Sequence, residues 1–303
     1  MLTCKPMIEV LKNGALVIKY PNPNFPIIIR RGKMSEYPNK TMPVQWHEDI
    51  EFFFVINGLS EYYIGGHHIK LSSGDMIFIN SGQVHMNSTI SDDLDYIIIA
   101  IHPRMLSLGI MKDSLTEHLL KDMRFCYYVC RNNSENATVF SDIIFAMSNA
   151  AEEGGALSQL DIVSLTNQLY RKICECYTPA NFISTEISNS NQEILRNIIL
   201  FIYNNFSQKL SLDEIASSGH VSRSKCCSLF AKYLRQSPTD FLNEYRLNES
   251  CRLLEESDYR LSEIAQLCGF ADQSYFNKLF KKKFECNPGQ YRSAKKHTQK
   301  PAS

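Results

Sequence analysis

Four side chains in the first third of the chain have the types and the spacing to bind a metal ion or a polar small molecule. Gln45, His47 and Glu51 fall within one stretch of seven residues, and His85 follows 34 residues after Glu51. Two imidazoles and a carboxylate form a ligand set that proteins use for iron. The same groups can hydrogen-bond a polar effector such as a sugar, or they can be satisfied polar groups inside a barrel. All three interpretations stay open, and convergence of polar groups favours the effector pocket.

A second stretch whose side chains could bind a partner is "LSEIAQLCGFADQSYFNKLFKKKF", residues 261–284. It holds two short helical patterns joined by a Gly-Phe turn. One face of the second pattern is apolar: Phe276, Leu279, Phe280 and Phe284. Another face is polar: Gln273, Ser274, Asn277 and Lys278. Gln and Asn can make paired hydrogen bonds to adenine, and Lys reaches guanine or phosphate. Most polar helix faces are only solvated, so the rest of the chain must decide between these interpretations.

The composition fits a chain with two packed domains. It has 303 residues and is 44% hydrophobic, which is enough for ordinary cores. The longest apolar run, 96–101, has the length of a buried strand and falls far short of the roughly 18 residues needed to cross a bilayer. The first residues lack the features of a signal peptide. We therefore expect a cytoplasmic protein without a membrane partner, with its ten cysteines reduced.

The net charge of zero conceals an asymmetry between the two ends of the chain. From residue 193 onward there are 17 Lys and Arg against 12 Asp and Glu, whereas the residues before it hold 15 and 20. A basic C-terminal third in a neutral chain favours a polyanion as the partner of that part.

Residues 1–104 read as a domain of short strands. β-Branched and aromatic residues are concentrated in segments separated by Gly, Asn, Asp and Ser, namely 50–58, 61–71, 74–80 and 94–101. This spacing is typical of an antiparallel sandwich or small barrel. Gly65-Gly66 predicts a hairpin turn.

Residues 105–180 change to helical spacing. We predict helices over 137–154 and 156–177, with Gly154-Gly155 ending the first. The second helix carries an apolar stripe, formed by Leu157, Leu160, Val163, Leu165, Leu169 and Ile173. Such a stripe can pack on its own domain or form a dimer interface, and both remain open. The polar, Asn- and Ser-rich residues 181–192 then predict an interdomain linker.

Residues 193–295 are helical throughout and contain an internal repeat. Ile215-Ala216 recurs at 264–265, 49 residues later, and Leu229-Phe230 recurs at 279–280, 50 residues later. Each copy predicts a short helix, a tight turn and a second helix. The second helix begins after the N-cap Ser222 in the first copy and after Asp272 in the second. This is the pattern of a helix-turn-helix motif. Residues 238–257 predict one long helix between the copies, and 296–303 form a basic tail.

Residues 193–295 resemble the DNA-binding domain of AraC/XylS-type transcription regulators. The residues that carry the resemblance are "IAQLCGFADQSYFNKLFKKKF", 264–284, followed by "NPGQYR", 287–292. The resemblance implies two helix-turn-helix motifs that bind double-stranded DNA, and a contact with RNA polymerase. By position it implies that one recognition helix offers Arg223, Ser224, Cys227 and Ser228, and the other Gln273, Ser274, Asn277 and Lys278. We expect Lys281 to contact the phosphate backbone.

This sequence departs from the family at three positions. Ser228 stands where the family often has arginine, which leaves the base preference there open. Arg235 and Glu285 stand where it has glycine after each recognition helix. A residue other than glycine in a left-handed helix cap costs roughly 1 kcal/mol, so we expect the fold to tolerate both, with a different helix end as one possible outcome.

The pattern that contains the first four candidate residues resembles the two motifs of the cupins. It runs through the four candidates and, before His85, through Gly58, Gly74, Asn80 and Gly82. The resemblance places His47, Glu51 and His85 at three metal-ligand positions of metal-dependent cupins, with Gln45 replacing the remaining histidine. It also implies that a regulator of this type uses the barrel for a small molecule without metal. The candidate apolar wall consists of Trp46, Phe52, Phe54, Tyr62 and Phe78, of which strand alternation sends only some inward.

Together these features predict an α+β multidomain protein: a cupin-like barrel with a helical extension, then an all-α domain with two helix-turn-helix motifs. The expected function is that of a ligand-responsive, dimeric transcription activator without enzymatic activity or cofactor. Two alternatives remain. One is a metal-dependent cupin enzyme with an accessory helical domain, which Gln45 disfavours. The other is a constitutive DNA-binding protein whose barrel only dimerises.

Overall fold

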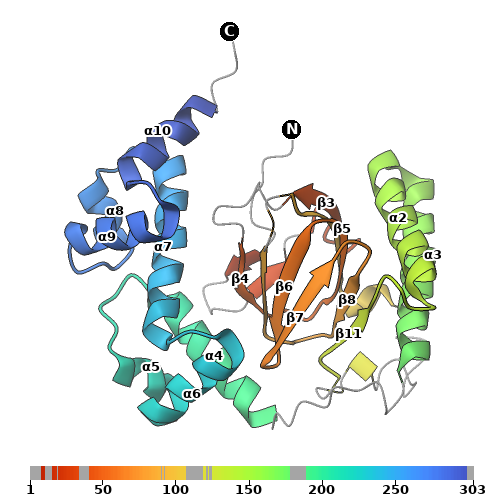
Figure 1. The fold of residues 1–303 in the computed structure, drawn as a ribbon, viewed down its shortest axis with the longest axis horizontal. Helices are drawn as coiled ribbons and strands as arrows, with labels where there is room; N and C mark the ends of the chain where they lie inside the picture. The colour runs from red at the N-terminus through yellow and green to blue at the C-terminus, as the bar shows by residue number, and fades with distance from the viewer. Residues whose placement is uncertain are drawn as a thin grey trace. The chain divides into compact units, whose positions relative to one another are not determined.

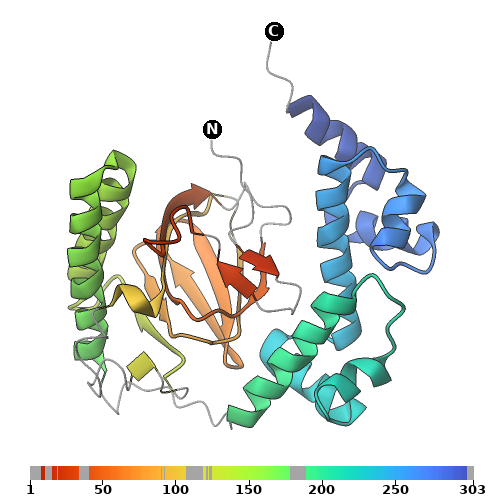
Figure 2. The ribbon, with the colours of Figure 1, turned by 180° about the vertical axis from the view of Figure 1, so that it is seen from behind.

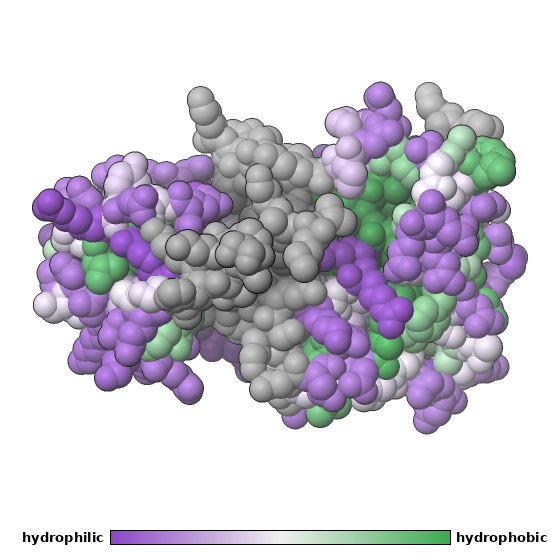
Figure 3. Space-filling view, turned by 90° about the horizontal axis from the view of Figure 1, so that it is seen from above, coloured by the Kyte–Doolittle hydropathy of each residue, from purple (hydrophilic) through white to green (hydrophobic). Residues whose placement is uncertain are grey.

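The computed structural model describes residues 8–10, 16–18, 20–33, 41–89, 91, 93–106, 119–120, 122, 125–177 and 189–298 (Figures 1 and 2). The chain divides into two compact units, with the boundary between Gln192 and Glu193. No described helix is long and apolar enough to cross a membrane. Hydrophilic residues cover much of the described surface in Figure 3, with hydrophobic residues in separate patches among them.

The first unit is built from antiparallel strands. Their bounds are β1 Ile8–Val10, β2 Leu16–Ile18, β3 Ile27–Lys33, β4 Thr41–Gln45, β5 Ile50–Asn57, β6 Leu59–Ile64, β7 His67–Ser72, β8 Met76–Ile79, β9 His85–Thr89, β10 Asp95–Ile101 and β11 Tyr127–Cys130. They form a two-stranded pair β1-β2, a five-stranded sheet in the order β11-β8-β5-β10-β3, and a four-stranded sheet in the order β4-β9-β6-β7. The strand segments predicted from the sequence are confirmed, as is the hairpin at Gly65-Gly66, where both residues have positive φ.

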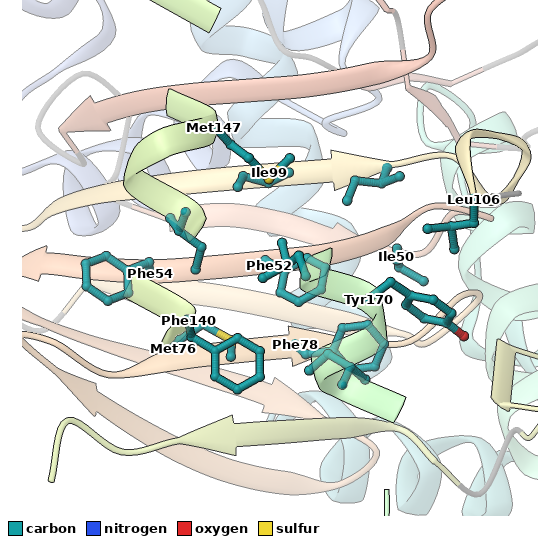
Figure 4. Close-up of a cluster of buried hydrophobic side chains, with 14 of the residues drawn as sticks. Ile50, Phe52, Phe54, Met76, Phe78, Ile99, Leu106, Phe140, Met147 and Tyr170 are labelled. Carbon is teal, nitrogen blue, oxygen red and sulfur yellow. The ribbon is translucent and has the colours of Figure 1, made fainter. Parts of the chain in front are cut away.

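Alternation along β5 sends its side chains to two different cores. Phe53 and Val55 point between the two sheets, where they pack with residues of β6 and β7. Ile50, Phe52 and Phe54 point to the opposite face of the five-stranded sheet and join a cluster that includes Phe140 and Tyr170 of two helices (Figure 4). Both faces of β5 are therefore covered.

The predicted apolar wall of the barrel is only partly right. Tyr62 is fully buried between the sheets. Phe52, Phe54 and Phe78 instead belong to the cluster beneath the helices. The sequence could not separate the two faces, because a strand buried on both sides lacks the polar positions that would mark one of them.

Two helices, α2 Ala137–Glu153 and α3 Ala156–Cys176, cover the outer face of the five-stranded sheet. The two helices lie next to each other in Figures 1 and 2. The break at Gly154-Gly155 is confirmed, and both glycines have positive φ. A short 3-10 helix, η3, covers Pro103–Met105. The segment 105–180 is not wholly helical, because β11 adds a strand beside β8. Four residues are too few for periodicity to reveal that strand.

The apolar stripe of α3 is split between two surfaces. Leu169 and Ile173 are completely buried in the cluster beneath the helices, and Leu165 is partly buried against it. Leu157 and Leu160 are 77% and 67% exposed. Packing on its own domain thus accounts for the stripe from Leu165 onward, but not for Leu157 and Leu160.

The second unit is helical throughout. Its helices are α4 Asn189–Asn205, whose first four residues precede the boundary, α5 Leu212–Ser218, α6 Arg223–Leu234, α7 Pro238–Glu256, α8 Leu261–Leu267, α9 Gln273–Phe284 and α10 Pro288–Thr298. Residues 189–192, which we predicted as the end of the linker, form the first turn of α4, and 181–188 lie outside the described residues. Residues 296–298 of the predicted tail continue α10.

The two copies of the repeat have the same local structure. Ser222 and Asp272 are confirmed as N-caps, whose side chains accept hydrogen bonds from the backbone N–H of Lys225 and Tyr275. Both recognition helices keep a left-handed end, with φ of 55° at Arg235 and 58° at Glu285. A third strained residue, His220 with φ 55°, occupies the turn position that Gly269 fills in the second copy with φ 77°. The first copy therefore tolerates left-handed backbone without glycine at two places.

One buried arginine ties the two copies together. Arg246 of α7 donates from Nε to the carbonyl of Phe206 at 2.8 Å and from Nη2 to the carbonyl of Gln208 at 2.7 Å. Its guanidinium also lies 5.8 Å from the ring centre of Phe270 in the second copy. A Cβ on Gly269 would lie 2.3 Å from the same Phe206 oxygen, so the turn of the second motif approaches this loop too closely for a side chain. The segment 206–208 is thus the shared contact of both motifs.

We predict that Arg246→Met lowers the free energy of unfolding by about 2–3 kcal/mol, because the carbonyls of Phe206 and Gln208 lose a charged donor in two part-buried hydrogen bonds. Urea titration followed by helix content measures the change. Arg252→Met on the same helix is the control, since Arg252 pairs with Glu249 and Glu256 at the surface, and should change stability by less than about 1 kcal/mol. Equal losses of unfolding free energy in the two variants would show that the Arg246 contact stabilises the domain no more than the surface ion pairs of Arg252 do.

Candidate functional site

The four candidate residues of the barrel meet at one place. Gln45 ends β4 and lies directly opposite His85, the first residue of β9. Glu51 shares the inward face of β5 with Phe53 because the two residues are two positions apart. His47 precedes this strand. All four side chains are buried, and none is more than 6% exposed.

The carboxylate of Glu51 is the centre of this cluster. Its Oε2 lies 3.6 Å from His47 Nε2 and 3.6 Å from His85 Nε2. The hydroxyl of Tyr62 donates to its other oxygen at 3.2 Å. The Gln45 amide nitrogen lies 2.9 Å from His85 Nε2. The arrangement brings together all four residues that the sequence pattern selected.

Backbone carbonyls fix the orientation of both imidazoles. His47 Nδ1 lies 3.1 Å from the carbonyl of Asp49, and His85 Nδ1 lies 2.8 Å from the carbonyl of Gln83. Because a carbonyl oxygen can only accept, both Nδ1 atoms carry a proton. The Nε2 atom of each ring then faces the Glu51 carboxylate. It carries a lone pair when the ring is neutral and a hydrogen that attracts the carboxylate when the ring is protonated.

Electrostatics keep Glu51 charged although it is buried. Burial opposes ionisation, but the neighbouring His85 and His47 outweigh it and hold the pKa of Glu51 well below its usual range. Burial and the nearby Glu51 charge raise the pKa of Tyr62 well above its usual value. Tyr62 therefore acts as a hydrogen-bond donor to the carboxylate.

Three buried polar atoms in this region have no hydrogen-bond partner among the described residues: Gln45 Oε1, His47 Nε2 and Asn87 Oδ1. Leaving such an atom unpaired costs about 1–3 kcal/mol, so each one calls for an explanation. Asn87, whose amide donates to Ser60 at 2.9 Å, was missed by the sequence analysis. It lies two residues after His85, so alternation along one strand could have placed it on the same face.

The cluster also fits a divalent cation by its geometry. The ligand atoms of His47, Glu51 and His85 lie within 4.8 Å of one another, and both imidazoles have their Nδ1 held by a carbonyl as metal-binding histidines usually do. The Gln45 amide nitrogen, however, points at the His85 lone pair. Metal binding would require this amide to turn, which would place its oxygen toward the ion.

Another buried contact extends from the cluster to the segment before the barrel. The hydroxyl of Tyr20 donates to Asp49 at 2.5 Å, and the Asp49 carboxylate lies 3.8 Å from His47 Nδ1. Burial and the Asp49 carboxylate raise the pKa of Tyr20 well above its usual value. Neither residue belonged to the sequence pattern, and no spacing signal links them because they are far apart in the chain.

On the first recognition helix, α6, the predicted contact residues lie toward solvent. Arg223, Ser224 and Ser228 are exposed and Cys227 is half-buried. Arg223 is engaged by Asp213 of α5, whose two carboxylate oxygens accept hydrogen bonds from its Nε and Nη2. The Arg223 contact holds the pKa of Asp213 below its usual value.

On the second recognition helix, α9, the predicted polar face is also open to solvent. Gln273, Ser274, Lys278 and Lys281 are exposed, while Asn277 is half-buried. The apolar face is confirmed, with Phe276 and Phe280 fully buried and Leu279 and Phe284 partly so. Tyr275, which was not predicted from the sequence, is 43% exposed at the start of this helix and accepts a hydrogen bond from Asn243 of α7 at 3.3 Å.

Comparison with known families matches both halves of the chain. Residues 215–294 match the model of a helix-turn-helix domain, and residues 33–102 match that of a cupin domain. A transcriptional regulator of unknown role from Bacillus subtilis, YdeC, is 23% identical over 88% of this chain and 91% of its own length. The lactose operon transcription activator of Staphylococcus xylosus is 21% identical over 78% of this chain and 81% of its own. A crystal structure of apo ToxT from Vibrio cholerae aligns with a TM-score of 0.46 at 13% identity, covering 88% and 97% of the two chains.

Proposed function

Because the chain belongs to the AraC/XylS-type transcription regulators and carries a cupin domain before its DNA-binding domain, we propose that it binds duplex DNA through α6 and α9 under the control of a small molecule held in the barrel. The observation that carries the DNA-binding half is the pair of recognition helices. Each is anchored by an apolar face and presents polar and basic side chains to solvent. A helix of this kind fits the major groove.

One copy of the chain can address two neighbouring groove segments. The two motifs are joined by α7, a helix of 19 residues that is about 28 Å long. In Figure 1 the α5–α6 pair lies toward one end of α7 and the α8–α9 pair toward the other. Successive major-groove faces are roughly 34 Å apart, which is of the same order as this spacer. Base contacts come from Arg223, Ser224, Cys227 and Ser228 on α6 and from Gln273, Ser274, Asn277 and Lys278 on α9.

A pair of substitutions on α9 separates base readout from phosphate binding. Gln273→Ala should weaken binding to the preferred site by about 5- to 100-fold and leave binding to random duplex nearly unchanged, since it removes a base contact. Lys281→Ala should weaken binding to any duplex and lower the salt slope by about one, since it removes a phosphate contact. Affinity is measured on both duplexes across a salt series. The same effect of both variants on random DNA would contradict this division.

The effector site is the cluster of Gln45, His47, Glu51 and His85. Support comes from the unpartnered buried atoms, which offer an acceptor on Gln45, a lone pair on His47 and an acceptor on Asn87. A small molecule with several hydroxyl groups can donate to all three and so remove the cost of leaving them unpaired. A sugar fits this chemistry. One relative is named for a lactose operon, which agrees with that class of ligand.

A divalent cation is the second candidate for this site. The observation in its favour is the pair of Nε2 atoms that lie 3.6 Å from one carboxylate oxygen, a set that suits several transition metals. If bound there, such an ion could act as the sensed ligand, or as a Lewis acid in a cupin enzyme. The amide of Gln45, which meets one of the two lone pairs, argues against this candidate.

Thermal unfolding of the full chain distinguishes the two candidates. We predict that one member of a panel of mono- and disaccharides raises Tm by several degrees, and that Zn²⁺, Ni²⁺, Fe²⁺ and EDTA leave it unchanged. Mass action gives about 2.7 kcal/mol at a hundredfold excess over Kd. His85→Ala should abolish the sugar shift, and His67→Ala, a half-buried histidine on β7, should keep it. A metal shift reversed by EDTA would support the cation instead. If neither sugar nor metal changes Tm, the cluster has only a structural role.

We propose that regulation is positive, with a contact to RNA polymerase when the protein is bound to DNA. The name of the Staphylococcus relative, a transcription activator, and the family resemblance support this sign. Transcript yield from a template with the upstream site, with and without the protein, measures it. Work on chromosomal DNA also implies a cytoplasmic location.

Dimerisation is the remaining part of the proposal. Leu157 and Leu160 on α3 are 77% and 67% exposed, and Val139 on α2 is 42% exposed. Exposed large apolar side chains on the helices that cover one domain face suit a two-fold contact with a second copy.

Leu160→Glu should convert a dimer to a monomer, because it introduces a charge at the apolar contact. Gln159→Glu is the matched control: it adds the same charge to an exposed neighbour on the same helix and should leave the dimer intact. Sedimentation velocity reads out the mass of both variants. A wild-type protein that is monomeric at micromolar concentration, or an unaffected Leu160→Glu dimer, would exclude this interface.

A further inference from the structure

The first helix-turn-helix motif contains an ion pair that the second lacks. Arg223 is the first residue of α6, and Asp213 lies in the first turn of α5. The carboxylate of Asp213 accepts from Nε and from Nη2 of the guanidinium. Both side chains stay open to solvent, at 62% and 59% exposed. The pair therefore lies on the surface, next to the polar face of the recognition helix.

This side-on geometry leaves the other edge of the guanidinium available. An arginine carries five N–H donors in a planar fork. Two of them are used by Asp213, which leaves Nη1 and the second hydrogen of Nη2 as a parallel pair. Guanine presents two acceptors, O6 and N7, at matching separation in the major groove. Arg223 can therefore hold Asp213 with one edge and a guanine with the other.

The backbone between the two helices fixes where this pair lies. The turn is closed by hydrogen bonds from the N–H groups of Gly219 and Val221 to the carbonyl of Ala216, each at 3.2 Å. The Ser222 hydroxyl caps α6 by accepting from the Lys225 N–H at 3.2 Å. The first residues of a recognition helix are those that reach base edges. Arg223 is thus held at the start of the helix that enters the groove, and its long side chain has lost rotamer freedom before DNA arrives.

The second motif has different chemistry at the same two positions. With offsets of 49 and 50 residues, Asp213 corresponds to Ser262 and Arg223 to Gln273. Ser262 has no carboxylate, and Gln273 has no guanidinium. A glutamine side chain matches adenine rather than guanine. The two motifs, although built on the same fold, therefore carry different base preferences at the first position of their recognition helices.

We propose that Asp213 is a positioning residue for DNA recognition, which holds Arg223 so that its free edge reads one guanine in the site of the first motif. This inference rests on the proposed DNA-binding function and adds a base and a residue to it. Arg223 makes the base contact; Asp213 acts through Arg223 and does not touch the DNA. The alternative is that Arg223 contacts a phosphate. In that case the negative charge of Asp213 lowers the affinity for every duplex by the same factor and does not affect the base preference.

The test begins with the full-length wild-type protein and a library of random-sequence duplexes, from which bound sequences are selected and read. In the enriched site, each guanine is then replaced by adenine and by 7-deazaguanine, which lacks the N7 acceptor. We expect one guanine whose replacement lowers affinity about tenfold or more. Arg223→Ala and Arg223→Lys should both abolish that preference, because neither retains the fork, and Lys should keep most of the affinity for random duplex.

Asp213→Asn and Glu214→Gln form the decisive pair of variants. Both remove one negative charge from the first turn of α5, but only Asp213 contacts Arg223; Glu214 accepts from Ser211 as part of the helix cap. We expect Asp213→Asn to reduce the guanine preference at least threefold, and Glu214→Gln to retain it. Affinity for random duplex should rise to the same extent in both variants.

Two results would overturn the inference while leaving the DNA-binding function intact. The first is an enriched site in which no guanine preference depends on Arg223. The second is a guanine preference that depends on Arg223 and survives Asp213→Asn unchanged. Failure of the proposed function itself gives a different result, since the library would then yield no enriched sequence for the wild-type protein, with or without sugars.

Discussion

The contact of Arg246 with the loop 206–208 is the constraint on which the DNA-binding domain depends. A single guanidinium donates to two carbonyls of that loop, and the turn at Gly269 approaches the same Phe206 oxygen. The loop follows α4 and precedes the first motif, Arg246 lies on α7, which joins the two motifs, and Gly269 lies in the turn of the second. The loop before the first motif is thereby tied to the turn of the second motif. A rigid arrangement lowers the entropy lost when both helices bind at once, so it converts two weak contacts into one specific interaction.

The barrel shows a different balance between stability and function. Its apolar interior and the cluster beneath α2 and α3 consist of buried apolar side chains. One region instead gathers a carboxylate, two imidazoles and two carboxamides, and three of its polar atoms have no hydrogen-bond partner among the described residues. An apolar replacement would stabilise the fold more. Buried polar groups with incomplete hydrogen bonding are common where a protein binds a ligand. On the recognition helices, too, binding rather than stability explains the exposed arginine and lysine side chains, while buried phenylalanines on α9 stabilise the fold.

The sequence predicted much of this structure because its strongest signals are local. The hairpin at Gly65-Gly66, the break at Gly154-Gly155 and the caps at Ser222 and Asp272 follow from backbone preferences of single residues. The repeat predicted both helix-turn-helix motifs. The sequence did not predict which aromatic residues of β5 and β8 face the barrel, since both faces of those strands are buried. It also missed β11, Asn87 and the partners Asp213 and Arg246, because side-chain pairing across distant segments leaves no periodic trace. His220 adopts a left-handed backbone, and the preference of histidine for that region is too weak to predict this from the sequence.

The central claim is that this chain recognises specific DNA, and one binding measurement tests it most directly. The purified protein is titrated, at one fixed salt concentration and with and without the sugar panel, against the DNA upstream of its own and neighbouring genes and against a random duplex of equal length. We predict a preference for an upstream segment of about a thousandfold or more, and a preference about 5- to 100-fold smaller in Gln273→Ala. Binding that is no tighter than to random duplex under every condition would contradict it, and would direct attention to the His47, Glu51 and His85 cluster as an enzymatic site.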